Sequence, residues 1–110
     1  MIELRGYVDE KGNKPFAAWF EGLDTQAAAK VTSGLTRIEH GNFSNAKGVG
    51  AGVFEYKIDF GPGYRIYFGK DGERLVILIG GGMKKRQQKD IAAAQRCWAA
   101  YKRRKSQETQ

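Results

Sequence analysis

The chain of 110 residues has little of the two side chains that most often bind transition metals, with one cysteine, Cys97, and one histidine, His40. One cysteine cannot form an internal disulfide and cannot make a zinc site by itself. No cluster of carboxylates stands at ligand spacing either. We therefore expect no metal and no cofactor. The same scarcity leaves Ser-His-Asp and Cys-His catalytic schemes without support.

Long apolar runs are also missing. No stretch approaches the roughly 20 apolar residues that a membrane-spanning helix needs. Residues 1–10 lack the apolar core of a signal peptide. We expect a cytoplasmic protein with no membrane partner. The length allows one domain with a single modest core, which we place at residues 1–105, followed by a frayed tail at 106–110.

The net charge of +7 is unevenly distributed along the chain. Residues 1–82 hold ten Lys/Arg and ten Asp/Glu, whereas residues 83–110 hold nine Lys/Arg and two Asp/Glu. A neutral body with a basic C-terminal quarter indicates an anionic partner, and nucleic acid is the leading candidate. A solvated helix with a basic tail is the alternative interpretation.

The stretch from residue 53 to residue 79 predicts three antiparallel strands. Val53–Phe60 and Tyr64–Phe68 alternate between two faces, and Leu75–Ile79 is almost wholly apolar. One face of this sheet is aromatic and aliphatic, so we expect helices to cover it. The other face, which we expect to be open, carries three side chains close together: Lys57, Arg65 and Tyr67.

Two turns set the predicted register. The Asp71-Gly72 pair favours a two-residue hairpin loop, since such turns need positive φ angles. For residues 61–63 we expect a three-residue loop that places Ile58 opposite Ile66. A slip of one residue would turn every side chain to the other face and mix charge into the apolar one.

Helices and one more strand complete the prediction. We expect an edge strand at 2–7, a short helix from about Pro15, a second helix from an Asp24 cap to about His40, a Gly-rich loop at 42–52, and a final helix after the glycines at 80–82. That last helix has an apolar stripe and would dock by one face. The fold class is therefore α+β, with a mostly antiparallel sheet, a helical hairpin packed on one face, and a C-terminal helix.

Cleavage of RNA without a metal needs a base for the ribose 2′-hydroxyl, cations that stabilise the phosphorane, and a donor for the leaving 5′-oxygen. Arg65 cannot release a proton, so it would hold the phosphate, while a lysine among other cations could act as the base. On these grounds the candidates for catalysis are Arg65, Lys57, Lys84 and Tyr67. The candidates for RNA binding are Lys47, Lys85, Arg86, Lys89 and Arg96. A solvated face with ordinary ion pairs is the structural alternative.

The chain resembles the RelE/ParE superfamily of toxins in a series of segments. These are Gly52–Ile58, Asp59–Phe68 with its Gly-Pro-Gly-Tyr-Arg hairpin, the apolar strand, the glycines at 80–82, Lys84 and Gln87–Ile91. The closest branch is the HigB-like group of addiction module killer proteins, which is also related to phage Gp49. The similarity covers nearly the whole chain.

The resemblance assigns roles by position. Arg65 matches the arginine that binds the scissile phosphate, and Lys84 matches a lysine that follows the glycines. Lys57 stands where many relatives have arginine, and Met83 stands where they commonly have aspartate. These two departures leave the identity of the base open.

The resemblance implies a RelE-like, microbial-RNase-like fold and the toxin of a bacterial type II toxin–antitoxin system. It implies an endoribonuclease that cuts mRNA, generally in the ribosomal A site, leaves a 2′,3′-cyclic phosphate, and arrests translation and growth. The implied partners are mRNA, the ribosome and a cognate antitoxin of helix-turn-helix type, with operator DNA bound only by the toxin–antitoxin complex. Two alternatives stay open: a toxin of the same fold that inhibits DNA gyrase, and a non-catalytic nucleic-acid-binding accessory protein.

Overall fold

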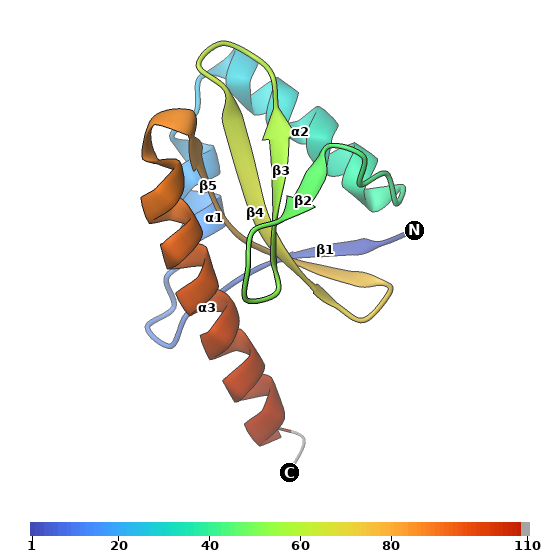
Figure 1. Cartoon of the computed structure of the whole chain (residues 1–110), viewed down its shortest axis with the longest axis vertical. Coiled ribbons are helices and arrows are strands. Elements are labelled where there is room, and N and C mark those ends of the chain that lie inside the picture. Colours follow the sequence, from blue (N-terminus) through green and yellow to red (C-terminus); the bar gives the residue numbers. More distant parts are fainter. Residues whose placement is uncertain (109–110) are drawn as a thin grey trace.

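The computed structural model describes residues 1–108 and has an α+β fold built on one five-stranded sheet. In chain order the elements are β1 (Glu3–Gly6), α1 (Pro15–Glu21), α2 (Thr25–Glu39), β2 (Ala46–Gly48), β3 (Val53–Ile58), β4 (Tyr64–Asp71), β5 (Leu75–Met83), the 3₁₀ turn η1 (Lys84–Arg86) and α3 (Gln87–Glu108). Their arrangement is shown in Figure 1. The short strand β2 lies inside the stretch that we expected to be a loop.

The sheet is mixed, with strand order β1-β5-β4-β3-β2. The strands β2 to β5 pair antiparallel, but β1 runs parallel to β5. The edge position expected for the first strand is confirmed. Its direction makes the sheet mixed and not wholly antiparallel, because the chain passes through α1 and α2 between β1 and the other four strands.

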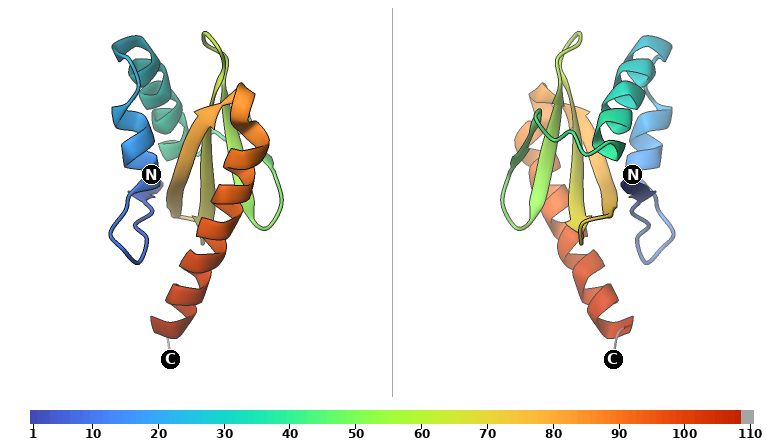
Figure 2. Two further views of the ribbon diagram at one scale, coloured as in Figure 1. Left: turned by 90° about the vertical axis from the view of Figure 1, so that its left-hand side faces the viewer. Right: turned by 90° about the vertical axis from the view of Figure 1, so that its right-hand side faces the viewer.

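Helices cover both faces of this sheet. In the side views of Figure 2, α1 and α2 lie on one side and α3 lies on the other. Each side has its own apolar core. The core under α1 and α2 contains Tyr56, Ile66 and Phe68, and the core under α3 contains Tyr67 and Trp98.

The face predicted to be apolar is the one that α1 and α2 cover. The alternation within β3 and β4 therefore gave the correct face for each side chain. The expectation that the opposite face is open is wrong. The apolar stripe of α3 docks there, and it consists of Ile91, Ala94, Trp98 and Tyr101.

The second helix begins and ends as expected. The Asp24 side chain caps α2 by accepting a hydrogen bond from the Ala27 N–H at 2.8 Å. Gly41 follows the helix with a φ of 80°, a conformation that glycine adopts without steric cost. This short, capped helix fixes one wall of the α1–α2 core.

Both hairpin loops are longer than predicted. Ile58 pairs with Tyr64 rather than Ile66, so residues 59–63 form the first loop. Asp71 pairs with Leu75, so residues 72–74 form the second. The first loop differs from the predicted one by two residues, and an even difference keeps every side chain of β3 and β4 on its expected face.

The glycines at 80–82 lie inside β5 and do not end it. Close packing explains them, because a Cβ at Gly81 would collide with the Trp19 ring and one at Gly82 with the Asp90 carboxylate. Gly82 also pairs with Arg65 on β4. The glycines thus let α1 and α3 approach the sheet from opposite sides beside the predicted site.

The last helix reaches Glu108, past the point where we expected the tail to fray, and residues 109–110 of that tail lie outside the described residues. Its far end is tied to the β4–β5 hairpin. Tyr101 donates a hydrogen bond to Asp71 at 2.5 Å, and Lys105 pairs with the same carboxylate. Burial and this carboxylate raise the pKa of Tyr101 to about 12, so its hydroxyl stays protonated as a donor. No helix within residues 1–108 is both long and apolar enough to cross a membrane.

Candidate functional site

The predicted site residues on β3 and β4 are neighbours in the sheet. Lys57 pairs with Arg65, and Glu55 pairs with Tyr67. All four side chains belong to the face that α3 packs against. Arg65 is only 5% exposed and Tyr67 only 1%. The expected solvated arginine is therefore a buried one, because the first turns of α3 lie over this part of the face.

A buried carboxylate, Glu55, stands at the centre of this group, with 2% of its surface exposed. Its Oε2 atom accepts hydrogen bonds from the Tyr67 hydroxyl at 3.1 Å and from Gln87 Nε2 at 2.9 Å. Its Oε1 atom faces two cations, with Arg65 Nε at 3.6 Å and Lys47 Nζ at 3.9 Å. Two neutral donors hold one oxygen, and two positive charges face the other.

Tyr67 is committed to this network. Burial, followed by the charge of Glu55 and their hydrogen bond, raises the pKa of Tyr67. Its ring belongs to the α3 core. The expectation that Tyr67 stacks on a base or donates a proton to substrate is therefore wrong for the structure described. Tyr67 orients Glu55 instead.

A pocket of about 300 Å³ opens over Glu55 and Arg65. Its lining residues are Ser44, Asn45, Ala46, Lys47, Glu55, Lys57, Asp59 and Arg65. The side chains of Lys47 and Lys57 are 69% and 54% exposed, so they stand at the rim, while the buried ion pair forms the floor. Lys57 lies 3.5 Å from Asp59 at the solvent edge.

Two polar atoms at the floor, both of Arg65, make no hydrogen bond in the described part of the chain. Arg65 Nε and Nη1 are buried without a hydrogen-bond partner. The 3.6 Å separation between Arg65 Nε and Glu55 Oε1 is an ion pair and is too long for a hydrogen bond. Buried donors without partners are costly and uncommon, and they concentrate at binding and catalytic sites.

A second basic hollow, of about 660 Å³, lies where β5 passes into α3. Its lining residues are Lys84, Lys85, Arg86, Gln87, Gln88 and Lys89. The backbone N–H of Lys84 donates to the Gly63 carbonyl at 3.3 Å, which holds this segment beside the β3–β4 loop. Gln87 joins the two hollows, because it lines the second and binds Glu55 in the first.

The predicted residues thus divide among three places. Arg65, Lys57 and Lys47 share the first pocket, whereas Lys84 lines the second hollow together with three predicted RNA-binding residues, Lys85, Arg86 and Lys89. Arg96 lines neither hollow and is exposed on α3. Gln87 joins the two hollows, and the expectation that Lys84 acts together with Arg65 and Lys57 stays a prediction.

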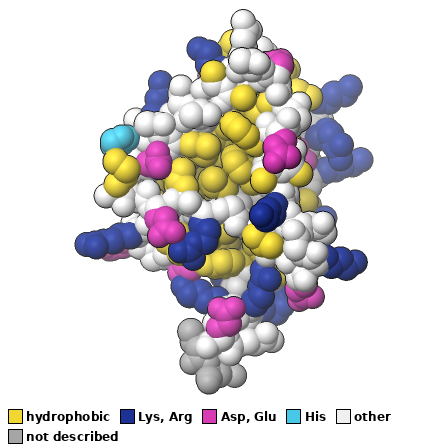
Figure 3. All heavy atoms as spheres, turned by 180° about the vertical axis from the view of Figure 1, so that it is seen from behind, with side chains coloured by type: hydrophobic (Ala, Val, Ile, Leu, Met, Phe, Trp, Pro, Cys, Tyr) yellow, Lys and Arg dark blue, Asp and Glu magenta, His cyan; other side chains and the backbone are white. Residues whose placement is uncertain are grey.

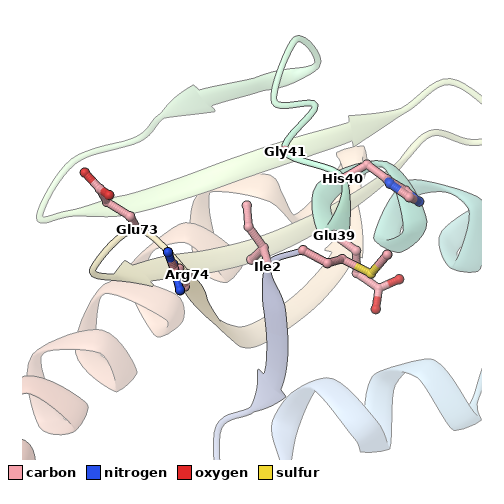
Figure 4. Close-up of a pocket in the computed structure, with 7 residues that line it drawn as sticks. Ile2, Glu39, His40, Gly41, Glu73 and Arg74 are labelled. Carbon is pink, nitrogen blue, oxygen red and sulfur yellow. The ribbon is translucent and has the colours of Figure 1, made fainter.

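A third hollow, of about 690 Å³, lies elsewhere and is lined in part by the single histidine, His40. Figure 4 shows that His40 and Glu39 lie on one side of it while Glu73 and Arg74 lie on the other, and the side chains do not converge. His40 is exposed at the C-cap of α2, as the sequence predicts. Within residues 1–108 no group of three or more His, Cys, Asp or Glu side chains could hold a metal ion.

One comparison with known proteins gives a close relative. A protein of Haemophilus influenzae with the description "Uncharacterized protein" is 42% identical over 88 residues, which covers 79% of this chain and 89% of that protein. The chain belongs to the same family as that protein. A match of this extent includes residues 53–71 wherever it begins, so the two sequences align over the segment that forms β3 and β4 in this protein. No family model matches the chain.

Sequence reasoning missed Glu55 and Gln87. Glu55 is not among the predicted site residues, because its face of β3 carries Val53 on one side of it and Lys57 on the other, which gives no clear signal for burial. Gln87 lies 32 positions from Glu55 in the sequence. Only the docking of α3 brings the two side chains together.

Proposed function

We propose that this protein is the toxin of a bacterial type II toxin–antitoxin system, with a RelE-like, microbial-RNase-like fold and a place in the HigB-like branch of the RelE/ParE superfamily. Its proposed activity is metal-independent, ribosome-dependent cleavage of mRNA in the cytoplasm, which arrests translation and growth. The observation that carries the proposal is the buried Glu55–Arg65 pair at the floor of a pocket with lysines at its rim. The resemblance of the sequence to that superfamily supports it.

Glu55 fits the role of the general base, which the sequence left open. Its Oε2 atom is held by Tyr67 and Gln87, so its Oε1 atom is the one left to accept the proton of a ribose 2′-hydroxyl. The 2′-oxygen would then attack phosphorus as the bond to the 5′-oxygen breaks. A 2′,3′-cyclic phosphate and a free 5′-hydroxyl are the expected products.

Arg65 and Lys57 fit the two cationic roles. The Arg65 guanidinium has buried donors to spare, and charge stabilisation is strongest where water is excluded. Lys57 stands beside it in register, is half-exposed, and can give a proton to the leaving 5′-oxygen. Three cations that line the second hollow, Lys84, Lys85 and Arg86, would hold phosphates that flank the cleaved bond.

The remaining partners of the proposed toxin follow from the superfamily resemblance. A cognate antitoxin of helix-turn-helix type would neutralise it, and the complex would bind operator DNA. In this proposal mRNA reaches the pocket on the ribosome.

Charge-preserving variants test the proposal. Arg65→Ala would leave Glu55 buried without its cation, which typically costs about 3–5 kcal/mol of stability, so loss of activity in that variant could reflect unfolding. Arg65→Lys and Glu55→Asp keep both charges but break the geometry. We expect each to reduce growth arrest and RNA cleavage at least about 100-fold, measured by mapping RNA 5′ ends after induction.

A matched pair serves as the control. Glu73→Asp and Arg74→Lys make the same substitutions at exposed positions in the β4–β5 loop and should leave cleavage unchanged. Full toxicity of a folded Arg65→Lys variant would reject the site. If the wild-type protein yields no cut RNA but induces a DNA damage response, the gyrase-inhibiting alternative replaces our proposal.

A further inference from the structure

The outer face of α3 carries a row of cations that have no ion-pair or hydrogen-bond partner among residues 1–108 of the structure. Lys89, Arg96 and Arg103 are spaced seven residues apart, which is two helical turns and about 10.5 Å along the axis. All three are exposed. At about 100° per residue they lie opposite the docked stripe, which includes Ala94 and Trp98. We call these three residues the basic ridge.

The basic ridge differs from the other cations near the end of α3. Arg104 donates a hydrogen bond to the Val8 carbonyl, Lys105 pairs with Asp71, and Lys102 lies 6.0 Å from the centre of the Trp98 ring. Arg104 and Lys105 thus hold α3 to the body of the protein, whereas Lys102 contacts a ring of its own helix. The three side chains of the ridge make no ion pair or hydrogen bond within residues 1–108, so their charges are left for another molecule.

Small side chains separate the cations of the ridge. Alanines occupy the positions that flank and lie between them on the outer face: Ala92, Ala93, Ala99 and Ala100. No aromatic or large aliphatic side chain interrupts this surface, because Trp98 and Tyr101 belong to the buried stripe. A partner that contacts this surface therefore meets evenly spaced positive charges separated by small side chains.

The side chains of this surface fit some classes of partner better than others. A protein partner needs aromatic or aliphatic anchors at the centre of its interface, and a membrane needs an apolar face to insert. A single-stranded nucleic acid needs exposed rings on which its bases can stack. The ridge offers none of these. Double-helical RNA needs only cations at its phosphates and is recognised by shape.

The opposite side of the molecule does not offer the same surface. Figure 3 shows it with acidic and basic side chains interspersed around an apolar area. Partly buried apolar residues of α1, of α2 and of the link between them, such as Phe20, Leu23 and Leu35, pack against the core under these helices. A polyanion would meet carboxylates there, so it is directed to α3.

We infer that the basic ridge of α3 is a docking surface for the backbone of double-helical RNA, separate from the pocket over Glu55 and Arg65. The inference rests on the proposed function only in taking RNA as the polyanion. The ridge and the pocket act on different parts of an RNA target. Folded RNA binds along α3, and a single strand enters the pocket.

Binding measurements with a non-cleavable RNA test this inference on the intact protein. The probes are a fluorescent 2′-O-methyl RNA hairpin and a 2′-O-methyl single strand of the same length, which lack the nucleophilic hydroxyl. We expect wild-type protein to bind the hairpin more tightly than the single strand. The triple variant K89Q/R96Q/R103Q should lose about 10- to 100-fold in hairpin affinity at about 100 mM salt, and its log–log salt slope should fall by about 2.

The control is the triple variant K14Q/R37Q/R74Q, which removes one lysine and two arginines from other exposed positions. If both triple variants lost the same affinity for the hairpin, the loss would reflect the lower net charge of the protein and not the basic ridge. That result would overturn the inference. So would a wild-type preference for the single strand, or for polyglutamate, which stands for an acidic protein partner. Failure of the wild-type protein to bind the hairpin would overturn the docking surface. It would leave the proposed cleavage to be decided by the RNA 5′ ends.

Discussion

At the scale of single residues, the site depends on how one carboxylate is shared. Glu55 is almost fully buried, and a buried charge is tolerated only when it is paired and hydrogen-bonded. Tyr67 and Gln87 satisfy one oxygen, and Arg65 with Lys47 compensates the charge at the other. The same contacts that make the burial possible also fix which oxygen faces the pocket.

Gln87 should therefore act as a positioning residue, and Gln87→Ala tests this. Loss of its 2.9 Å hydrogen bond frees the Glu55 carboxylate to rotate, so we expect kcat for RNA cleavage to fall about 10- to 100-fold with KM unchanged. Steady-state kinetics on a short RNA substrate give both constants.

Gln26→Ala is the matched control, because Gln26 is exposed on α2 and lines neither hollow. It should behave like the wild-type protein. A rise in KM with kcat unchanged in the Gln87 variant would mean that Gln87 contacts RNA directly, and the positioning role would have to be abandoned.

At the scale of elements, the site depends on how closely two helices approach β5. Gly81 faces the Trp19 ring of α1, and Gly82 faces Asp90 in the first turns of α3. Burial raises the pKa of Asp90, and the Arg86 side chain opposes that rise. Strand β5 can carry helices on both faces at this point because it presents no side chain there.

The two neighbouring glycines give a matched test of this packing. Gly81→Ala forces the rigid Trp19 ring aside, so we expect the free energy of unfolding to fall by about 1–3 kcal/mol. A Cβ at Gly80 meets no atom within 4 Å, so Gly80→Ala should change stability by less than about 0.5 kcal/mol.

Thermal denaturation followed by circular dichroism compares the two variants with the wild-type protein. A domain of this size loses roughly 4–8 °C in Tm for each kcal/mol. Equal Tm values for the two variants would show that close approach of α1 does not explain Gly81.

At the scale of the whole molecule, one sheet is shared by two cores. The two tryptophans report on different sides, because Trp19 packs against the core under α1 and α2 and Trp98 belongs to the core under α3. Side chains on both faces come from the same strands. Neither core can lose its packing without exposing the sheet that supports the other, so we expect one cooperative unit.

Two single-tryptophan variants test this cooperativity. Trp19→Phe leaves only Trp98 to report on the α3 side, and Trp98→Phe leaves only Trp19 to report on the other side. In each variant, we expect tryptophan fluorescence and far-ultraviolet circular dichroism to give the same urea midpoint. An earlier fluorescence transition for Trp98 would mean that α3 detaches before the sheet unfolds.

Much of the local structure could be predicted because its causes are local. Asp24 caps α2 and Gly41 follows its end with a positive φ, as their positions in the sequence indicate. The alternation along β3 and β4 placed Lys57 and Arg65 on one face. Loop lengths were wrong, since turn preferences near residues 61–63 and 72–74 compete with pairing along the whole strand.

The burial of the site was not predictable from the same signals. The apolar stripe of α3 predicts that one side of the helix packs against the sheet. It does not predict which face of the sheet the helix covers. Docking on the face of Arg65 turned an expected surface arginine into a buried one. It also brought Gln87 to Glu55 and gave that carboxylate the central position that we had assigned to lysines.

The sequence by itself therefore determined four of the five strands, the helices, the faces of β3 and β4, and the gathering of positive charge in the last quarter of the chain. These depend on spacing and composition, which act over a few residues. The tertiary structure alone decided which charges are buried, which oxygen of Glu55 faces a pocket, and which cations of α3 have no partner within residues 1–108. Those outcomes depend on contacts between segments 30 or more positions apart, such as Gln87 with Glu55 and Tyr101 with Asp71, and only the packed sheet brings such segments together.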